Sequence, residues 1–278
     1  MRISVILTTY NQPEALEKVL WGYAHQTRSD FQLLVADDGS GPETAEVIAR
    51  VRAATSLRPV HVWHEDRGFR KCEILNRAIL AADGDYLLFS DGDCIPRRDM
   101  VQVHAELAEP GRFLSGGCLR LPAELSERLS LEDIRSGRFV ELGWLRARGW
   151  RPGHRALRLV PWTGAAALFD RLTPTRTQFG GHNASTWRSA VEAANGFECE
   201  MGYGGLDRAL GYRLRNLGLR GKQVRHRAIC VHLHHERPYR NAETIRRNRE
   251  ILARILREGE TRARIGLAEL DRTAAEAV

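Results

Sequence analysis

The sequence predicts an α/β protein with a mostly parallel sheet flanked by helices and with a C-terminal helical extension. Two observations lead to this prediction. Short apolar runs rich in β-branched residues alternate with segments of helical periodicity, and short polar turns join them. Such alternation is typical of βαβ units, whose consecutive strands lie parallel. A chain of 278 residues that is 43% hydrophobic can also bury one large core.

Strands and helices are predicted in turn along the first part of the chain. The strands follow from apolar runs at 3–7, 31–36, 60–63 and 86–89. The helices follow from apolar residues three and four positions apart, at 15–24, 44–51 and 71–82. Asn11 is a candidate cap of the first helix, and Pro13 suits its first turn. The spacing in the third helix places these residues on its buried face: Ile74, Leu75, Ala78 and Ile79.

Two later stretches have different patterns. Positions 120–175 are rich in Arg, Gly, Pro and Trp, which suits either an excursion that covers a substrate or a poorly ordered insertion. Beyond Pro238, apolar residues at Ile245, Leu252, Ile255 and Leu256 mark one face of a long helix. The other faces of this predicted helix carry many arginines.

Composition limits the class of protein. The net charge of +7 favours an anionic partner without saying which one. The cysteines are odd in number and include no CxxC pair, so they indicate a reducing compartment and no disulfide framework. The N-terminus lacks the features of a signal peptide, and no apolar stretch is long enough to cross a bilayer. We therefore expect a soluble, cytoplasmic protein.

Asp91 and Asp93 stand two residues apart at the end of the fourth predicted strand. Two such carboxylates suit a hard divalent cation that also binds phosphate oxygens, although an ordinary solvated turn has the same sequence. Gly92 lets the backbone turn sharply between them. Ligands of parallel sheets bind beyond the carboxyl ends of the strands, so Thr8 and Tyr10 should lie at the same sheet edge.

Asp37 and Asp38 end the second predicted strand. They either cap the next helix or accept hydrogen bonds from a base or ribose. Arg70 and Lys71 stand at the start of the third helix, where two cations and a helix N-terminus can hold a diphosphate. Taken alone, these two residues are as easily explained by surface charge.

Asp207 follows a glycine-rich run and is expected in the first turn of a helix, where the helix dipole stabilises a carboxylate. It is either a helix-start residue or a general base. Three nearby histidines indicate metal coordination. An extended chain would place His232 and His234 on one face, whereas a turn would bring His232 to His235.

Taken together, these segments resemble the family 2 glycosyltransferases of the GT-A fold, which has a Rossmann-like sheet. The resemblance covers 1–107 and 179–240. It is carried, in order, by segments 4–11, 37–40, 67–76, 90–93 and 195–207. The last segment is also similar to a C-terminal motif of β-galactosyltransferases and chondroitin-polymerase-type enzymes.

The resemblance implies an inverting transferase that moves a sugar from a nucleotide-sugar donor, by default UDP-linked, to a hydroxyl of a glycan or lipid-linked glycan. It implies Mn²⁺ or Mg²⁺ as cofactor. Its nucleoside-binding residues would be Thr8, Tyr10 and Asp38, with Asp37 nearby. The diphosphate would face Arg70 and Lys71, and Asp91 would lie near the ribose and the metal. The metal ligands would be Asp93, His232 and His235, with His234 as an alternative, and Asp207 would be the catalytic base.

The same resemblance implies a division of the chain. A GT-A domain at 1–240 would consist of a nucleotide-sugar-binding half at 1–107 and an acceptor-binding, catalytic half at 108–240. A helical extension would follow at 241–278. One departure concerns the acceptor, because relatives carry a glutamate where this chain has Leu206. That glutamate often contacts the acceptor sugar.

Two other classes of function fit part of the pattern. A metal-dependent phosphohydrolase or nucleotidyltransferase also uses paired aspartates, but such phosphatases normally place them after the first strand. A non-catalytic module could bind anionic lipid through the arginines of the C-terminal helix, although glutamates interrupt that charge. We expect no nucleic-acid partner, and we leave open a peripheral contact of this helix with the inner face of a membrane.

Overall fold

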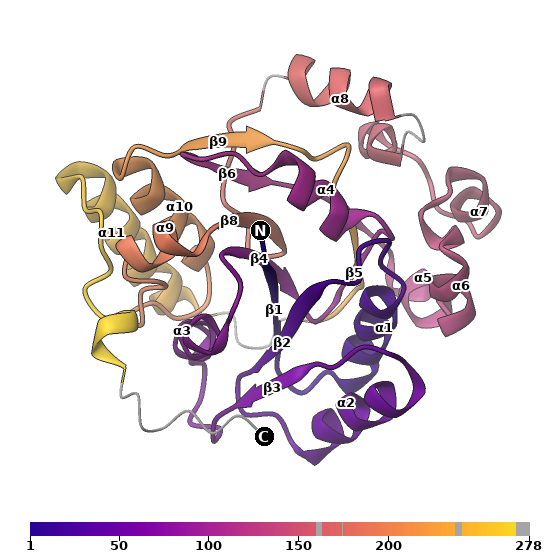
Figure 1. Ribbon diagram of the computed structural model, residues 1–278, viewed down its shortest axis with the longest axis horizontal. Coiled ribbons are helices and arrows are strands. Elements are labelled where there is room, and N and C mark those ends of the chain that lie inside the picture. Colours follow the sequence, from indigo (N-terminus) through magenta and orange to yellow (C-terminus); the bar gives the residue numbers. More distant parts are fainter. Residues whose placement is uncertain (160–162, 174, 237–240, 271–278) are drawn as a thin grey trace.

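A computed structural model describes residues 1–159, 163–173, 175–236 and 241–270. Its centre is a seven-stranded sheet in the order β3-β2-β1-β4-β8-β6-β9 (Figure 1). The strands in this order are Val60–Trp63, Phe31–Asp37, Ile3–Thr9, Tyr86–Asp91, Asn183–Trp187, Arg112–Ser115 and Arg220–Gln223. The first four are mutually parallel, β8 is antiparallel to β4 and β6, and β9 is parallel to β6. The predicted mostly parallel α/β fold is confirmed.

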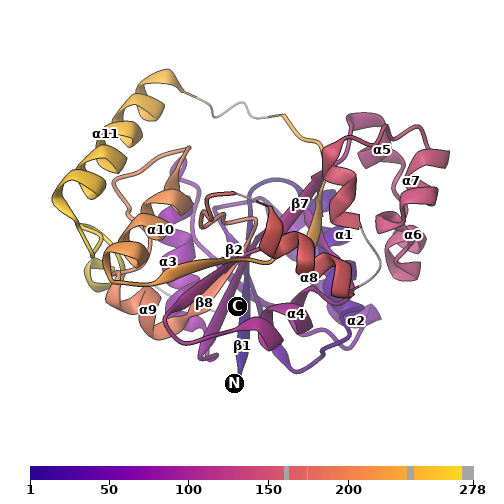
Figure 2. The same cartoon turned by 90° about the horizontal axis from the view of Figure 1, so that it is seen from above.

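Helices cover both faces of the sheet, because its central strands are apolar on both sides (Figures 1 and 2). In β1, Val5 and Leu7 belong to one hydrophobic core and Ile6 belongs to the other. Strands buried on both faces are expected in parallel sheets. The first core is covered by α1 (Pro13–Ala24), α2 (Pro42–Ala54) and α4 (Met100–Leu107). The second is covered by α3 (Lys71–Ala81), α9 (Arg188–Ala193), α10 (Leu206–Asn216) and α11 (Ala242–Glu258).

The predicted early strands and helices are confirmed, with one local correction. The apolar face predicted for α3 is buried throughout. Helix α1 begins at Pro13, but Asn11 is not its cap as predicted, since the flanking residue is Gln12. Asn11 has a left-handed backbone with φ of 48°. Its Oδ1 instead accepts a hydrogen bond from the backbone N–H of Gly41, which precedes α2, at 3.0 Å.

The described part of 120–175 is helical and packs on the first core. Leu125, Ile134 and Leu145 are buried there. The elements are α5 (Ala123–Arg128), α6 (Leu131–Ser136), η1 (Arg138–Val140), α7 (Leu142–Ala147), η2 (His154–Leu159) and α8 (Thr163–Leu172). This packing favours an ordered excursion and contradicts the alternative of a poorly ordered insertion for these residues.

A smaller sheet lies beside the main one and has the order β5-β10-β7. Its strands are Cys94–Pro96, Ile229–His232 and Gly117–Arg120. Asn183 at the start of β8 joins the two sheets, because its Nδ2 donates to the carbonyls of Gly117 at 2.9 Å and Ala228 at 3.2 Å. Its Oδ1 accepts from Nε2 of the buried His104 at 2.8 Å. This junction brings β10 and its histidine to the end of β4.

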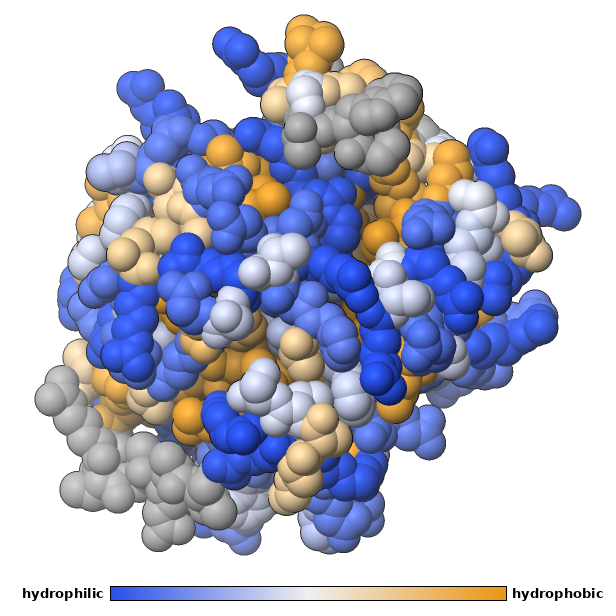
Figure 3. Space-filling model, turned by 45° about the vertical axis from the view of Figure 1, so that its right-hand side comes forward, coloured by the Kyte–Doolittle hydropathy of each residue, from blue (hydrophilic) through white to orange (hydrophobic). Residues whose placement is uncertain are grey.

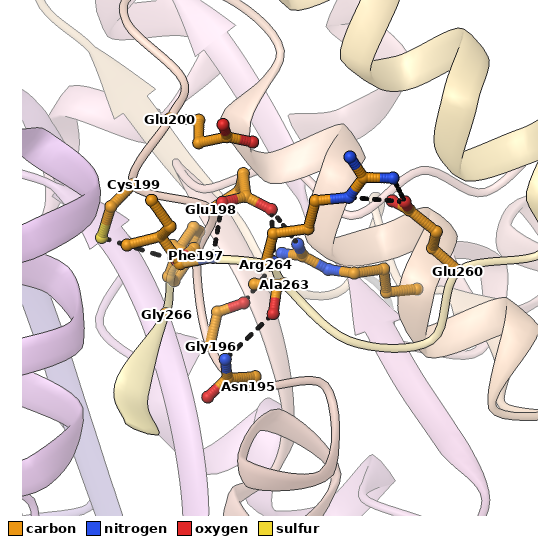
Figure 4. A network of polar contacts seen from close by, with 12 residues as sticks. Asn195, Gly196, Phe197, Glu198, Cys199, Glu200, Glu260, Ala263, Arg264 and Gly266 are labelled. Atoms are coloured by element: carbon orange, nitrogen blue, oxygen red, sulfur yellow. Dashed lines mark hydrogen bonds and ion pairs between the residues drawn. The ribbon is translucent and has the colours of Figure 1, made fainter. Parts of the chain in front are cut away.

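The C-terminal helix α11 packs against α10 and buries Ile251, Leu252 and Ile255 in the second core. The prediction was wrong for Leu256, which follows Ile255 on the helix and is exposed. The chain beyond it is held in place by polar contacts (Figure 4). The carboxylate of Glu198 accepts from the backbone N–H groups of Arg264 at 2.8 Å and Ile265 at 3.0 Å. The described part of the predicted extension therefore shares a core with the main body, and the proposed domain boundary at 240 stays a prediction.

One face of the molecular surface is mainly polar. On the face drawn in Figure 3, polar residues prevail and apolar residues form small dispersed groups. Within the described ranges, no helix combines the length and the apolar character that spanning a bilayer requires.

Candidate active site

A cavity of about 700 Å³ lies at the carboxyl ends of β1 and β4, as expected for ligand sites of parallel sheets. It is bounded by parts of both halves of the chain. The predicted residues in its lining are Thr8, Tyr10, Asp38, Lys71, Asp91, Asp93, Asp207, His232 and His235. Segments far apart in the sequence thus contribute to one cavity.

Lys71 and Asp91 form a charge pair in the cavity wall. Lys71 Nζ lies 2.7 Å from Asp91 Oδ1, and Thr8 Oγ1 donates to the same oxygen at 2.8 Å. Burial alone would lower the pKa of Lys71, but the carboxylates of Asp91 and Asp207 outweigh burial and raise it. Burial alone would raise the pKa of Asp91, but the Lys71 ammonium outweighs it and holds that pKa well below its usual range. Both groups are therefore charged at neutral pH.

Asp93 and two histidines converge beside this pair. Oδ2 of Asp93 lies 3.0 Å from Nε2 of His235 and 3.7 Å from Nε2 of His232. The two imidazole rings stack with their centroids 5.3 Å apart. The turn after β10 produces this arrangement, whereas His234 is directed elsewhere and is exposed. The structure thus brings together His232 and His235, one of the two pairings that the sequence left open.

The residues present fit a divalent cation. Nδ1 of His232 is hydrogen-bonded to the carbonyl of Leu233, and Nδ1 of His235 to the carbonyl of Glu236. A carbonyl can only accept, so Nδ1 carries the proton and each Nε2 presents its lone pair toward Asp93. One carboxylate and two imidazoles suit Mn²⁺ or a similar ion. Phosphate oxygens and water would complete such a site.

Asp38 is buried at the cavity edge and is held by two donors. Its Oδ1 lies 2.8 Å from Nε2 of His64, and its Oδ2 accepts from the backbone N–H of Arg70 at 3.1 Å. Asp37 is fully buried, and its two oxygens are engaged by Ser40 N–H and His61 at 2.9 Å each. Asp37 therefore stabilises the turn. It is not among the described residues that line the cavity.

Arg70 lies differently from the expectation that it faces a diphosphate. Its guanidinium donates to Glu73 Oε2 at 3.0 Å and to the carbonyl of Glu65 at 2.6 Å. Glu73 lies one turn further along α3, so the local helix supplies the countercharge. Among the described residues that line the cavity, Lys71 is present and Arg70 is not.

Asp207 occupies the first turn of α10, as predicted from the sequence. The loop before it contains Gly204 and Gly205 with φ of 109° and 88°, a region that favours glycine. From the other side, the chain approaches Asp207 so closely that a Cβ on Gly181 would lie 2.6 Å from Oδ1. The carboxylate is thereby held at the cavity edge, where a hydroxyl of a second substrate can reach it.

Several residues of the cavity were not singled out from the sequence. They are Cys118, Arg120, Arg158, His182 and Tyr203. His182 precedes β8, and its charge helps to lower the pKa of Asp91. Arg158 donates to the carbonyl of Cys118, which brings the excursion at 120–175 to the cavity. A histidine after a Gly-Gly pair is a weak local signal, and the arginines have no sequence motif that marks them.

The chain matches a family model described as glycosyl transferase family 2 over residues 4–129. It is 29% identical over 228 residues to a validoxylamine A glucosyltransferase of Streptomyces hygroscopicus subsp. jinggangensis, covering 78% of this chain and 52% of that protein. It is also 29% identical over 106 residues to chondroitin synthase of Escherichia coli, covering 38% of this chain and 15% of that protein. The chain spans about half the length of the glucosyltransferase and 15% of the length of the chondroitin synthase.

Two solved structures have a similar fold. The mannosyltransferase PcManGT from Pyrobaculum calidifontis, in complex with GDP-Man and Mn²⁺, has a TM-score of 0.57 and 21% identity, covering 86% of this chain and 58% of that chain. S. aureus TarS 1-349, in complex with UDP-GlcNAc, has a TM-score of 0.65 and 16% identity, covering 96% of this chain and 69% of that chain. At these identities the similarity concerns the GT-A fold alone.

Proposed function

The chain belongs to the family 2 glycosyltransferases, and on that premise we propose that it is a metal-dependent, inverting enzyme with a nucleotide diphosphate sugar as donor. The observation that supports this proposal most is the meeting of Asp93, His232 and His235 with Lys71 and Asp207 around one cavity. A cation site, a fixed positive charge and a carboxylate for proton transfer are what such a reaction requires.

The donor side is proposed to hold the nucleotide and its diphosphate. Thr8, Tyr10, Asp38 and Asp91 line the cavity and would hold the base and the ribose. The ammonium of Lys71 would stabilise negative charge on the leaving diphosphate. A divalent cation held by Asp93, His232 and His235 would supply further neutralisation of that charge when bound.

On the acceptor side, Asp207 is proposed as the general base. It would accept the proton of an acceptor hydroxyl while the hydroxyl oxygen forms a bond to the anomeric carbon. The bond between that carbon and the diphosphate oxygen breaks at the same time, and the electron pair stays on the diphosphate. Attack from the face opposite the leaving group inverts the anomeric configuration.

UDP is the proposed nucleotide and a glycan or lipid-linked glycan is the proposed acceptor. The fold neighbours carry both GDP-Man and UDP-GlcNAc, so the donor needs a direct test. The name of one relative, a validoxylamine A glucosyltransferase, indicates validoxylamine A as the acceptor of that protein. At the position where relatives carry a glutamate, this chain has Leu206, which lines the cavity. An apolar side chain cannot make the polar contact of that glutamate with the acceptor sugar. This difference is consistent with a different acceptor.

A thermal-shift panel tests the donor. UDP-, GDP-, dTDP- and CDP-sugars are each added with Mn²⁺ or with a chelator, and we expect one nucleotide series to raise the melting temperature only with metal. NMR of the product sugar then gives its anomeric configuration. Retention of configuration, or hydrolysis of simple phosphate monoesters without sugar transfer, would contradict the proposal.

A further inference from the structure

Three cysteine thiols meet directly behind the proposed metal ligands. Cys94, Cys118 and Cys230 lie on β5, β7 and β10, the three strands of the small sheet. Because β10 is central, its register places Cys230 beside Cys118 and His232 beside Cys94. Residues paired in neighbouring strands point to the same face of a sheet, so the three cysteine side chains share one face of the small sheet. All three are free thiols.

This thiol cluster is open to the cavity through Cys118, which lines it, while Cys94 and Cys230 are fully buried. One ligand atom each from Asp93, Cys94 and His232 lies within 4.8 Å of the others. Sulfur, imidazole and carboxylate donors therefore surround one point on the cavity floor. The described partners of the sulfurs are weak, such as the Asp93 carboxylate at 3.3 Å from Cys94 Sγ.

Donor chemistry distinguishes this point from an ordinary Mn²⁺ or Mg²⁺ site. Thiolate is a poor ligand for both of those ions, whereas a combination of thiolate and imidazole selects Zn²⁺ and related thiophilic ions. We propose that Asp93, Cys94 and His232 form a thiophilic cation site that overlaps the Mn²⁺ site and blocks sugar transfer when occupied. The blocking rests on the proposed function, whereas the binding of the ion does not.

Cadmium titration of metal-free protein tests the binding directly. We expect a thiolate-to-cadmium charge-transfer absorption in the wild type, and Cys94→Ser should weaken the Cd²⁺ affinity by about tenfold or more. Cys199→Ser, which changes a half-buried cysteine outside the cluster, should bind as the wild type does. Melting temperatures show whether each variant is folded. No absorption in the wild type, or equal affinity in a folded Cys94→Ser variant, would overturn the site.

Transfer assays then test the overlap. Zn²⁺ should inhibit the Mn²⁺-supported reaction, and excess Mn²⁺ should relieve that inhibition. If Zn²⁺ binds through Cys94 but transfer with Mn²⁺ continues unchanged, the overlap is wrong. Absence of transfer under every condition would refute the proposed function. The cadmium titration would still show whether the cation site exists.

An independent observation concerns Asn248 on α11, which is 1% exposed. Its Nδ2 donates to the carbonyls of Gly202, Tyr203 and Gly204 at 2.8, 3.1 and 2.8 Å. An amide nitrogen has only two hydrogens, so two of these carbonyls share one. A single buried side chain of the C-terminal helix thus gathers three consecutive carbonyls of the glycine loop.

This loop leads directly to Asp207. Tyr203 and Gly204 line the cavity, and Gly205 begins the helix that carries the carboxylate. A loop rich in glycine has many accessible conformations, so an external contact is needed to select one. We infer that Asn248 is a positioning residue, which orients the loop and Asp207 toward the acceptor. This inference rests on the role proposed for Asp207.

A matched pair of variants separates positioning from simple stability. Asn216→Ala removes another amide between α10 and α11, which donates to the carbonyls of Ile255 and Glu260 away from the cavity. We expect Asn248→Ala to lower kcat by about ten- to a hundredfold with unchanged donor affinity. Asn216→Ala should stay within about twofold of the wild-type kcat.

Asn248→Ser, which keeps one donor, should recover part of the activity. Equal kcat losses in the two alanine variants, or an equal loss of donor affinity in Asn248→Ala, would overturn the positioning role. Full activity of Asp207→Asn would instead refute the proposed function, whatever Asn248 does.

Discussion

The two sides of the cavity are built in different ways. On the donor side, Thr8 and Asp91 stand at the ends of neighbouring parallel strands, and Lys71 begins the helix that packs beside them. On the acceptor side, Asp207 depends on a glycine loop whose carbonyls are held by Asn248 of α11. Sheet hydrogen bonds and ion pairs hold the donor side. A few side-chain contacts across long stretches of sequence hold the acceptor side.

This difference has a consequence for how each side tolerates change. Charged groups on the donor side neutralise one another, so removing one leaves a charge without its partner in a cavity of low dielectric. On the acceptor side the groups that shape the loop are neutral, and their loss changes geometry more than charge. We therefore expect donor-side variants to lose ligand binding, and acceptor-side variants to lose turnover.

The largest expected effect is on the donor side. Asp93→Asn should lower transfer by about a thousandfold, because a neutral amide ligates a divalent cation poorly and the leaving diphosphate loses its stabilisation. Titration of Mn²⁺ in the presence of the donor nucleotide measures the cause, since both affinities should fall. Full activity of this variant without added metal would contradict the metal site.

Asp207→Asn tests the acceptor side in isolation. We expect transfer to slow by about a hundredfold or more, the usual scale for a lost general base, while donor binding stays nearly unchanged. Calorimetric donor titration and single-turnover transfer measure the two quantities separately. Unchanged turnover would rule out Asp207 as the base.

The junction between the main sheet and the small sheet should respond to pH through the buried His104. Burial lowers its pKa to about 4. In the unfolded chain its pKa is about 6.5, so only the unfolded state takes up a proton between these values. Stability is therefore lost as pH falls from about 6.5 toward 4. At pH 5 this loss is about 2 kcal/mol.

Urea unfolding at pH 7 and pH 5 measures that contribution. His104→Gln, which does not titrate, should lack this part of the pH dependence. His25→Gln, a half-buried histidine of α1, serves as the control. An identical change in unfolding free energy between the two pH values for wild type and His104→Gln would contradict the assignment.

The smallest expected effect concerns the glycine loop that precedes Asp207. Gly205→Ala and Gly218→Ala each place a side chain at a left-handed φ, of 88° and 91°. Each should cost about 1 kcal/mol of stability. Only Gly205 precedes Asp207, so only that variant should also lower kcat. Equal activities at matched stability would mean that the loop conformation does not govern turnover.

Sequence patterns were sufficient for most of the donor side. Apolar runs and the turns after them located the ends of β1, β2 and β4, and parallel pairing brings such ends to one edge. Thr8, Asp38, Lys71 and Asp91 lie in the cavity for that reason. Arg70 shows the limit of this reasoning, because Glu73, one helical turn away, engages the guanidinium that was expected to face a ligand.

The helices at 120–175 were missed, and most of them are only three to six residues long, which is too short for a clear helical periodicity. Their burial comes from contacts with a core formed elsewhere, such as those of Leu125 and Leu145. The choice between His234 and His235 was also undecidable, because it depended on where β10 ends.

By itself, the sequence determined the order of strands and helices over residues 3–89, the side of the sheet on which ligands bind, and the residues at the ends of these strands. These features follow from local periodicity and from the geometry of parallel pairing. Only the tertiary structure decided that Cys94, Cys118 and Cys230 meet and that Asn248 holds the loop before Asp207. Such contacts join residues far apart in the chain, and packing of the whole core selects them.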